Sequence, residues 1–451
     1  MTDTIDNIPP AVDPATAPVA KQSTEVGSVF VSNYPAYSFW SEEAVPEAHR
    51  ALNRPGDRHN PLGLYLHIPF CRKRCKFCYF KVYTGKNSDE IQIYLDALAR
   101  ELDTYGKLPA VQQRPLKFVY FGGGTPSFIS VKHLKWLVEK AREALPWDGV
   151  EEVAFECEPG TLSQSKLAAI KEIGVTRLSL GIEHFNDDIL RENGRAHVSK
   201  EIYRIQSWVK EMGFEQLNID LIAGMVGDTR ESWEDTVQRA IDYDPDSITI
   251  YQLELPYNAV YSRHLREGEK IPVADWKTKQ AWHSYAIDQL LTAGYEVSSA
   301  YTMIKKDSPN KKFVYRDALW HGSDMLATGV ASFGHMSGVH FQNAGRWDAY
   351  LEGANAGRLP IQRAFATNRR EQLIREMILQ LKLGRIEPGY FQDKFSVNIL
   401  NDFSEAFERL EKAGQLRLAE GEITLTREGL LQVDQLLPQF YEPKYRNARY
   451  T

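Results

Sequence analysis

The chain has 451 residues, of which 43% are hydrophobic and 25% are charged, and its net charge at pH 7 is −6. A chain of this length can bury a large core and typically forms more than one domain. The acidic balance argues against an overall electrostatic attraction to nucleic acid or to a membrane surface. The sequence has no run of 18 apolar residues and no apolar stretch near Met1, so we expect neither a membrane span nor a secretory signal.

The first 60 residues show no sustained helix or strand period. Residues 1–27 are rich in Ala, Pro, Thr, Asp and Val, a composition that predicts a disordered tail. Residues 28–60 contain aromatic side chains, among them Tyr34 and Trp40, and we expect them to form an N-terminal segment that wraps over the main domain.

Three cysteines follow within eight residues: Cys71, Cys75 and Cys78, in the spacing C-x3-C-x2-C. An ordinary cubane iron–sulfur cluster takes four thiolates, so three would leave one iron open for a bound molecule, as an enzyme requires. Zinc sites usually add a second cysteine pair or a downstream histidine, which this segment lacks. The spacing therefore predicts a [4Fe-4S] cluster. Cysteines used in this way fit a reducing, cytoplasmic compartment.

From residue 61 the sequence alternates strand and helix patterns. Strands are expected at 64–68, 117–121, 152–156, 177–180, 216–220 and 247–251, and helices near 89–105, 131–144, 163–173, 232–243 and 276–293. Six such units predict an α/β fold whose parallel sheet curls into a full or partial barrel. We assign residues 61–300 to this barrel and residues 301–365 to a substrate-side segment. The fourth cysteine, Cys157, follows an apolar strand pattern, which favours a buried structural thiol.

The last segment, residues 366–451, has a different pattern. Helices are expected at 370–383 and 399–413, a hairpin over 414–426, and a further helix from Arg427. This is the order of a winged-helix module. Because the segment lacks a concentrated basic face, a packing or lid role is favoured over nucleic-acid recognition.

Polar residues gather where the predicted strands end. Parallel α/β sheets place their active sites at the carboxyl ends of the strands. Three glycines at 122–124 follow the second strand and would let a ligand approach the backbone, although a tight turn would also explain them. Glu156, Glu183, Arg195 and Asp220 end or follow later strands. Carboxylates suit ribose hydroxyls and an arginine suits a ligand carboxylate, so the set predicts a nucleoside-containing ligand such as S-adenosylmethionine (SAM).

These motifs resemble those of the radical SAM superfamily and, within it, the oxygen-independent coproporphyrinogen III oxidase family, from about Val29 to the C-terminus. The resemblance implies a partial (β/α)6-type radical SAM barrel with a C-terminal winged-helix-like α+β module. It implies that Cys71, Cys75 and Cys78 hold a [4Fe-4S] cluster whose open iron binds SAM, and that an electron then cleaves SAM to a 5′-deoxyadenosyl radical. The residues that would contact SAM by this resemblance are Tyr65, Gly123, Gly124, Thr125, Glu156, Glu183, Arg195 and Asp220.

Two departures from the family pattern leave the reaction open. The decarboxylase has a fourth cysteine where this chain has Phe80, and it has glutamine where this chain has Glu183. Phe80 resembles the haem-chaperone branch and the branch of methyltransferases and cyclopropanating enzymes, which hold two SAM molecules. We therefore expect a tetrapyrrole decarboxylase first, with a methyltransferase or cyclopropanase and a haem chaperone as alternatives. No residue is assigned a catalytic role.

Partners follow from the same reasoning. A radical SAM enzyme needs an external electron donor, such as flavodoxin or ferredoxin, and a small-molecule substrate, here a tetrapyrrole. His335 and His340 offer ligands for haem iron or proton donors, although histidines in polar loops are more often only hydrogen-bonded. The basic loop from Lys305 to Lys312 could meet substrate carboxylates or could simply be solvated.

Overall fold

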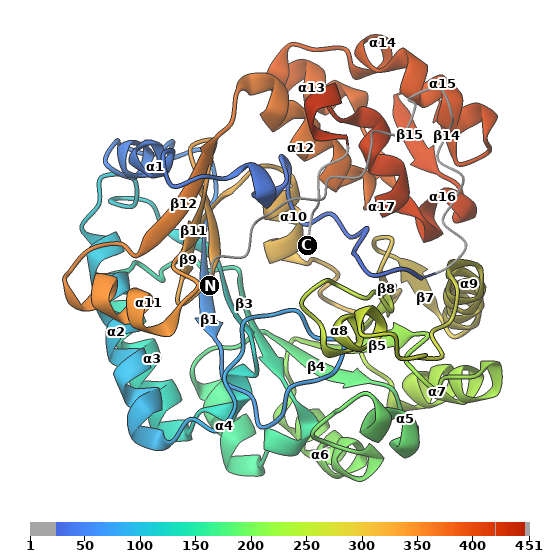
Figure 1. The fold of residues 1–451 in the computed structure, drawn as a ribbon, viewed down its shortest axis with the longest axis horizontal. Coiled ribbons are helices and arrows are strands. Elements are labelled where there is room, and N and C mark those ends of the chain that lie inside the picture. The colour runs from blue at the N-terminus through green and yellow to red at the C-terminus, as the bar shows by residue number, and fades with distance from the viewer. Residues whose placement is uncertain (1–23, 420, 447–451) are drawn as a thin grey trace.

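A twelve-stranded sheet forms the centre of the computed structural model, which describes residues 24–419 and 421–446 (Figure 1). Its strand order is β12-β11-β10-β9-β1-β2-β3-β4-β5-β6-β8-β7. The six strands from β1 to β6 are parallel, and each pairs with the next. They are β1 (Leu62–Ile68), β2 (Leu116–Gly123), β3 (Glu152–Cys157), β4 (Arg177–Glu183), β5 (Gln216–Ala223) and β6 (Ser247–Gln252).

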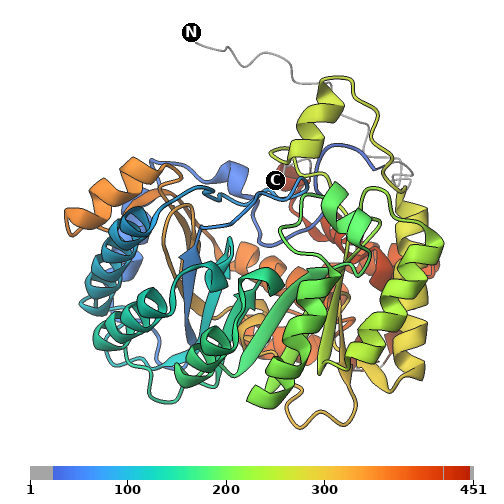
Figure 2. The ribbon, with the colours of Figure 1, turned by 90° about the horizontal axis from the view of Figure 1, so that it is seen from below.

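Helices connect these strands and lie on the outside of the curved sheet (Figures 1 and 2). The major ones are α2 (Ser88–Gly106), α3 (Val131–Ala144), α4 (Gln164–Glu172), α6 (Ser199–Met212), α7 (Arg230–Tyr243) and α9 (Trp276–Thr292), and the shorter α5 (Asp187–Glu192) and α8 (Val260–Arg266) lie between them. The prediction of alternating strands and helices is confirmed. No helix among the described residues is long and apolar enough to span a bilayer.

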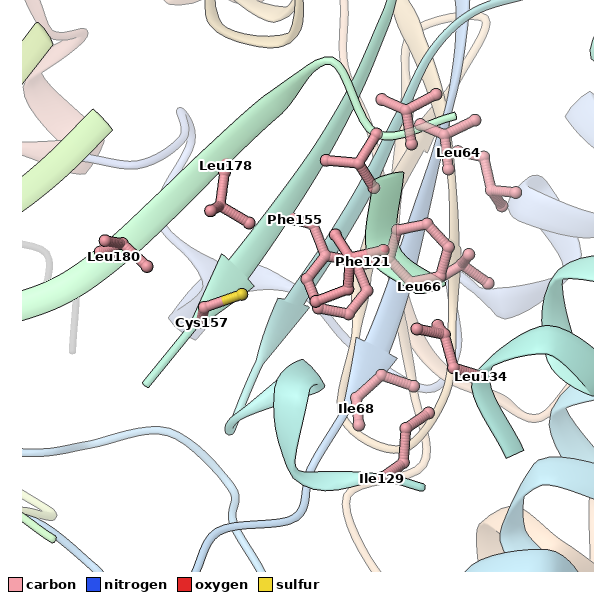
Figure 3. Close-up of a cluster of buried hydrophobic side chains, with 14 of the residues drawn as sticks. Leu64, Leu66, Ile68, Phe121, Ile129, Leu134, Phe155, Cys157, Leu178 and Leu180 are labelled. Atoms are coloured by element: carbon pink, nitrogen blue, oxygen red, sulfur yellow. The ribbon is translucent and has the colours of Figure 1, made fainter. Parts of the chain in front are cut away.

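The two faces of the parallel strands differ in chemistry, because successive side chains point to opposite sides. In β1, Leu64, Leu66 and Ile68 are fully buried in the core under the helices. Figure 3 shows these side chains packed with Phe121 and Phe155 of the next strands. The side chains between them, such as Tyr65, line the inner face. The apolar stripe therefore supplies the packing energy and leaves the inner face free for polar groups.

Cys157 belongs to this apolar core and is 5% exposed (Figure 3). The prediction of a buried structural thiol is confirmed.

The barrel is open rather than closed. The second neighbour of β1 is β9 and the second neighbour of β6 is β8, so the ends of the six-stranded unit do not pair with each other. Short strands that the sequence pattern does not predict extend the sheet on both sides: β7 (Tyr295–Val297), β8 (Thr302–Lys305), β9 (Asp324–Thr328), β10 (Phe333–Met336), β11 (Val339–Asn343) and β12 (Ile361–Ala366). Strands this short carry too few alternations to show a period. Residues 301–365 thus contribute strands to the same sheet, along with α10 (Val314–Trp320) and α11 (Trp347–Asn355).

The C-terminal segment forms a second hydrophobic core of its own. Its elements are α12 (Arg369–Leu381), β13 (Arg385–Ile386), α13 (Pro388–Phe395), α14 (Ile399–Asp402), α15 (Ser404–Lys412), β14 (Leu416–Ala419), β15 (Glu422–Leu425), α16 (Arg427–Leu431) and α17 (Val433–Leu436). The small sheet has the order β13-β15-β14. The predicted helix at 370–383 corresponds to α12, and the predicted helix at 399–413 is divided into α14 and α15. The strand β13 and the short helix α13, which the sequence pattern does not predict, lie between them.

The N-terminal segment runs between the barrel and this module (Figure 1). Residues 1–23 of the predicted tail lie outside the described residues, and Gly27 donates a backbone hydrogen bond to Leu255. Val31 N donates to Asp434 Oδ1 of α17 at 2.9 Å. Farther along, α1 (Val45–Leu52), which the sequence pattern does not predict, packs against β12.

Candidate functional site

The cysteine loop begins directly after β1 and is fixed to the turn after β2. Gly124 N donates to Ile68 O at 2.9 Å, and Thr125 N donates to Phe70 O at 2.9 Å. These bonds continue the pairing of β1 and β2 beyond the strands. They place the first cysteine beside the glycine turn, at the carboxyl ends of the parallel strands.

Close packing explains the glycines of this turn. Gly123 has φ +108°, and a Cβ at this position would lie 2.4 Å from the ring of His67. A Cβ at Gly124 would lie 2.8 Å from the backbone of Pro69. Both positions therefore need glycine for the turn to reach the cysteine loop.

The three thiols lie half-buried, and two of them receive hydrogen bonds from the predicted SAM residues. Thr125 Oγ1 donates to Cys71 Sγ at 3.3 Å, and Arg195 Nη1 donates to Cys75 Sγ at 3.3 Å. Burial raises the pKa of Cys71 to about 11 and that of Cys78 to about 12. Metal binding requires thiolates, so bound iron would have to supply the charge that holds these cysteines deprotonated.

The donor set fits a cluster better than a single ion. Over residues 24–419 and 421–446, no three His, Cys, Asp or Glu side chains converge as one metal ion requires. A cubane cluster has a different requirement, because each thiolate binds a separate iron. Three thiols on one short loop meet that requirement and leave one iron without a protein thiolate.

Three predicted carboxylates come together on the inner face. Glu156 of β3 accepts from Tyr120 Oη at 2.7 Å and from Gly123 N at 3.3 Å. Asp220 of β5 accepts from Ser179 Oγ and from Asn218 Nδ2, each at 2.9 Å. Burial raises the pKa of Glu156 to about 7 and that of Asp220 to about 6, and their mutual repulsion adds to the rise in the pKa of Glu156.

The third carboxylate, Glu183, ends β4 in a bulge, where its backbone has φ +67°. Burial raises the pKa of Glu183 to about 7, and the nearby Arg195 opposes this rise. Arg195 Nη2 lies 3.5 Å from Glu183 Oε1 and donates to Gly181 O at 2.6 Å. Arg195 therefore joins the cysteine loop to the carboxylates.

One buried nitrogen at this site, Arg195 Nε, lacks a hydrogen-bond partner. Beside the glycine turn, burial lowers the pKa of His67 to about 4, so its ring is neutral. The Nδ1 atom of His67 lies 3.4 Å from the hydroxyl of Tyr65, whose ring stacks on Tyr120 at 5.9 Å. Buried polar atoms are rarely left unpaired, so Arg195 Nε favours a polar ligand here, and SAM provides a carboxylate that such a donor needs.

The sequence analysis missed an ion-pair group that anchors the cysteine loop. Glu158 lies 3.0 Å from both Arg72 and His197 Nδ1. Burial opposes the ionisation of Glu158, but the hydrogen bond from His197 and the charges of His197, Arg72 and Arg195 outweigh it and lower the pKa of Glu158 to about 2. The only signal was Arg72 between two cysteines, and no spacing rule links it to Glu158.

His335 and His340, the candidate haem ligands, have hydrogen-bond partners within the protein. His340 is fully buried, accepts from Asn33 Nδ2 at 3.2 Å and donates to Tyr34 O at 3.1 Å. His335 Nδ1 lies 3.3 Å from Ser323 O. Both rings therefore serve the packing of the N-terminal segment and β9.

The basic loop at 305–312 lies at the wrong end of the sheet for substrate carboxylates at the site. Lys312 O accepts from Arg177, the first residue of β4, at 2.8 Å. Lys305 and Lys311 pair with Asp244 and Glu296. The loop therefore borders the amino ends of the strands, opposite the cysteines.

Comparison with known proteins gives the same result as the geometry. The Radical SAM superfamily model matches residues 65–240. The haem chaperone HemW of Haemophilus influenzae is 30% identical over 61% of this chain and 71% of its own. The oxygen-independent coproporphyrinogen III oxidase of Synechocystis is 24% identical over 88% of this chain and 87% of its own. The structure of the coproporphyrinogen III oxidase HemN from Escherichia coli superposes with a TM-score of 0.79 at 23% identity, covering 93% of this chain and 99% of that one.

Fold and site together define a radical SAM protein, a class that binds a [4Fe-4S] cluster and SAM. Within that class, the chain belongs to the family that contains the oxygen-independent coproporphyrinogen III oxidases and the HemW haem chaperones.

Proposed function

We propose that this chain is an active radical enzyme that cleaves SAM and acts on a tetrapyrrole, with a decarboxylation like that of coproporphyrinogen III oxidase as the first candidate reaction. The observation that carries the proposal is Arg195, which contacts Cys75, Gly181 and Glu183 at once. It couples the cluster loop to the carboxylates that would bind SAM. Relatives named for coproporphyrinogen oxidation match most of the chain's length and favour the tetrapyrrole.

In this proposal the cluster and SAM, when bound, supply a 5′-deoxyadenosyl radical. The residues of the chain bind and orient the ligand. Glu156 and Asp220, held by Tyr120 and Ser179, accept from ribose hydroxyls or the SAM amino group, and Gly123 and Gly124 allow the backbone to approach. Arg195 Nε is free to donate to the SAM carboxylate. An external one-electron donor, such as flavodoxin or ferredoxin, completes the system.

The test is anaerobic cluster reconstitution followed by incubation with SAM, dithionite and coproporphyrinogen III, with chromatographic separation of the products. Formation of 5′-deoxyadenosine together with a decarboxylated, vinyl-bearing product supports the proposal. An intact cluster that binds SAM but yields no 5′-deoxyadenosine contradicts it.

A second candidate, methyl or methylene transfer, is favoured by Phe80. Its ring is 44% exposed at the position where the decarboxylase has a cysteine. This reaction predicts S-adenosylhomocysteine as well as 5′-deoxyadenosine under turnover. The formation of 5′-deoxyadenosine alone would contradict it.

A third candidate, haem transfer, is favoured by the relatives named haem chaperones. The engaged hydrogen bonds of His335 and His340 argue against these two residues as iron ligands. A haem titration tests whether the chain is a haem chaperone that uses these histidines. Haem binding with a Soret shift that is lost in His335→Ala or His340→Ala would favour this function.

A further inference from the structure

Two pairs of aromatic rings border the candidate site, and neither is explained by SAM or cluster binding. The first pair follows the last cysteine: Tyr79 and Phe80 stack with centroids 4.5 Å apart and planes 24° apart. The second pair lies at the carboxyl end of β6, where Tyr251 stacks on Tyr301 at 5.9 Å and 28°. Adjacent exposed apolar side chains that form a patch often mark a ligand-binding site.

All three outward rings are open to solvent. Tyr79 is 39% exposed, Phe80 44% and Tyr251 40%. Other large hydrophobic side chains among the described residues are exposed to a similar degree, so exposure alone does not single out these rings. Their place beside the candidate site distinguishes them.

The two pairs lie around the same carboxylates. Burial raises the pKa of the Tyr251 hydroxyl well above its ordinary value, and the charges of Asp220, Glu156 and Glu183 raise it further. The cysteine loop that carries the first pair also contacts the segment that follows β6: Tyr261 N donates to Lys76 O at 3.1 Å, and Arg74 Nη2 donates to Asn258 O at 3.3 Å. The two pairs are therefore held at the same, carboxyl edge of the sheet.

The second pair is held rigidly from behind. The Tyr301 hydroxyl donates to Asp434 of the C-terminal module, and Phe30 of the N-terminal segment packs against the Tyr301 ring at 5.6 Å. The first pair stands on the cysteine loop, which Arg72 and Glu158 tie to β3. Both pairs are therefore preorganised to receive a flat ring, which lowers the entropic cost of binding.

We propose that Phe80 on Tyr79 and Tyr251 on Tyr301 form an aromatic clamp that holds a flat aromatic ring of the substrate, such as one pyrrole, above the three carboxylates. The inference rests on the proposed function and adds the residues that set substrate specificity. Offset stacking and edge contacts with such rings are favourable and select flat ligands. Phe80, which stands where the decarboxylase has a cysteine, would then contribute a ring surface to substrate binding instead of a thiol.

The test measures the affinity of the reconstituted, SAM-loaded protein for coproporphyrin III, a flat tetrapyrrole, from its Soret absorbance. Phe80→Leu and Tyr251→Leu should each weaken binding about tenfold or more, because they remove ring contacts. Phe80→Trp keeps a ring and should bind nearly as well as the wild type. Tyr203→Leu removes an equally exposed tyrosine on α6 (42% exposed) and should leave the affinity unchanged.

Equal affinity in the wild type, Phe80→Leu and Tyr251→Leu would overturn the clamp, as would a wild type that does not bind coproporphyrin III. Formation of 5′-deoxyadenosine from SAM without substrate, measured on the same samples, reports separately on the proposed function. A protein that forms 5′-deoxyadenosine but shows no ring dependence of binding would therefore lose the clamp and keep the radical chemistry.

Discussion

Arg195 is the residue on which the site depends most directly, because it makes contacts that no other cation there replaces. Its planar fork reaches Cys75 Sγ, Gly181 O and Glu183 simultaneously. A lysine at this position would keep the charge but could not reproduce that geometry.

Arg195→Lys should therefore weaken SAM binding about tenfold or more, a loss of about 1.4 kcal/mol or more. Equilibrium binding of SAM to the reconstituted protein measures this, with iron content determined in parallel. Arg191→Lys is the matched control, because Arg191 is exposed and pairs only with Asp187 and Asp188 of its own helix. Unchanged SAM binding in Arg195→Lys would remove this residue from the site.

Glu183 predicts a dependence of SAM binding on pH. With its pKa raised to about 7, Glu183 is mostly neutral at pH 6 and mostly ionised at pH 8. An ionised carboxylate accepts a hydroxyl hydrogen bond more strongly than a neutral one, so SAM affinity should rise across this interval. Glu183→Gln should reduce the rise between pH 6 and pH 8 and leave the part that comes from Glu156, whose pKa is also raised to about 7. A wild-type profile as flat as that of the variant would contradict the prediction.

Single residues also mark the limit of sequence reasoning about the site. Spacing alone was enough to single out Cys71, Cys75 and Cys78, and strand ends singled out Glu156 and Asp220. No linear pattern pairs Arg72 with Glu158 or His197, because the three residues are far apart in the chain. Arg72 lies in the cysteine loop, Glu158 follows β3 and His197 precedes α6. The environment of His340 likewise depends on a segment 306 residues away.

At the scale of the elements, the turn after β2 determines how the cysteine loop lies on the barrel. Gly123 combines a left-handed backbone with contact against His67. Gly149 has a similar backbone, with φ +84°, but has open space around it.

Gly123→Ala should cost about 3 kcal/mol or more, since both strain and a clash arise, whereas Gly149→Ala should cost only about 1 kcal/mol from strain. Urea unfolding midpoints of the two variants measure the difference. Gly123→Ala should also lower iron incorporation, because the turn supports the loop. Equal midpoints would show that the turn can relax.

Element prediction succeeded for the repeating strand–helix units and failed for the strands that lie outside this repeat. The six parallel strands and the helices between them each span enough residues to show alternation or a helical stripe. The strands β7 to β12 have three to six residues and take their place from pairing with strands already present. Such strands are defined by tertiary contacts, which a local pattern does not contain.

At the scale of the whole molecule, one buried ion pair connects the C-terminal module to the N-terminal segment. Lys382 Nζ of the C-terminal module lies 2.7 Å from Asp434 and also donates to Val31 O of the N-terminal segment. Lys382 is 1% exposed, so water does not solvate its charge.

Lys382→Met should destabilise the protein by about 3–5 kcal/mol, because it leaves Asp434 buried without its cation. Thermal unfolding followed by circular dichroism measures the loss. The double variant Lys382→Met/Asp434→Leu should recover part of it, since an apolar pair no longer contains an unpaired charge. If the single variant melts like the wild type, the ion pair is not what joins these parts.

The position of Cys157 has a practical consequence for following the protein in solution. It is the one cysteine of four that faces the packed side of the sheet, while the other three lie half-buried on the loop. In the cluster-free protein, a thiol reagent should modify three cysteines quickly and the fourth only as the core opens. The labelling of Cys157 therefore reports on global unfolding. Its rate, measured by mass spectrometry, would give the rate at which the core opens without an added probe. Four cysteines that react at one rate would mean that the sheet opens far more readily than its packing suggests.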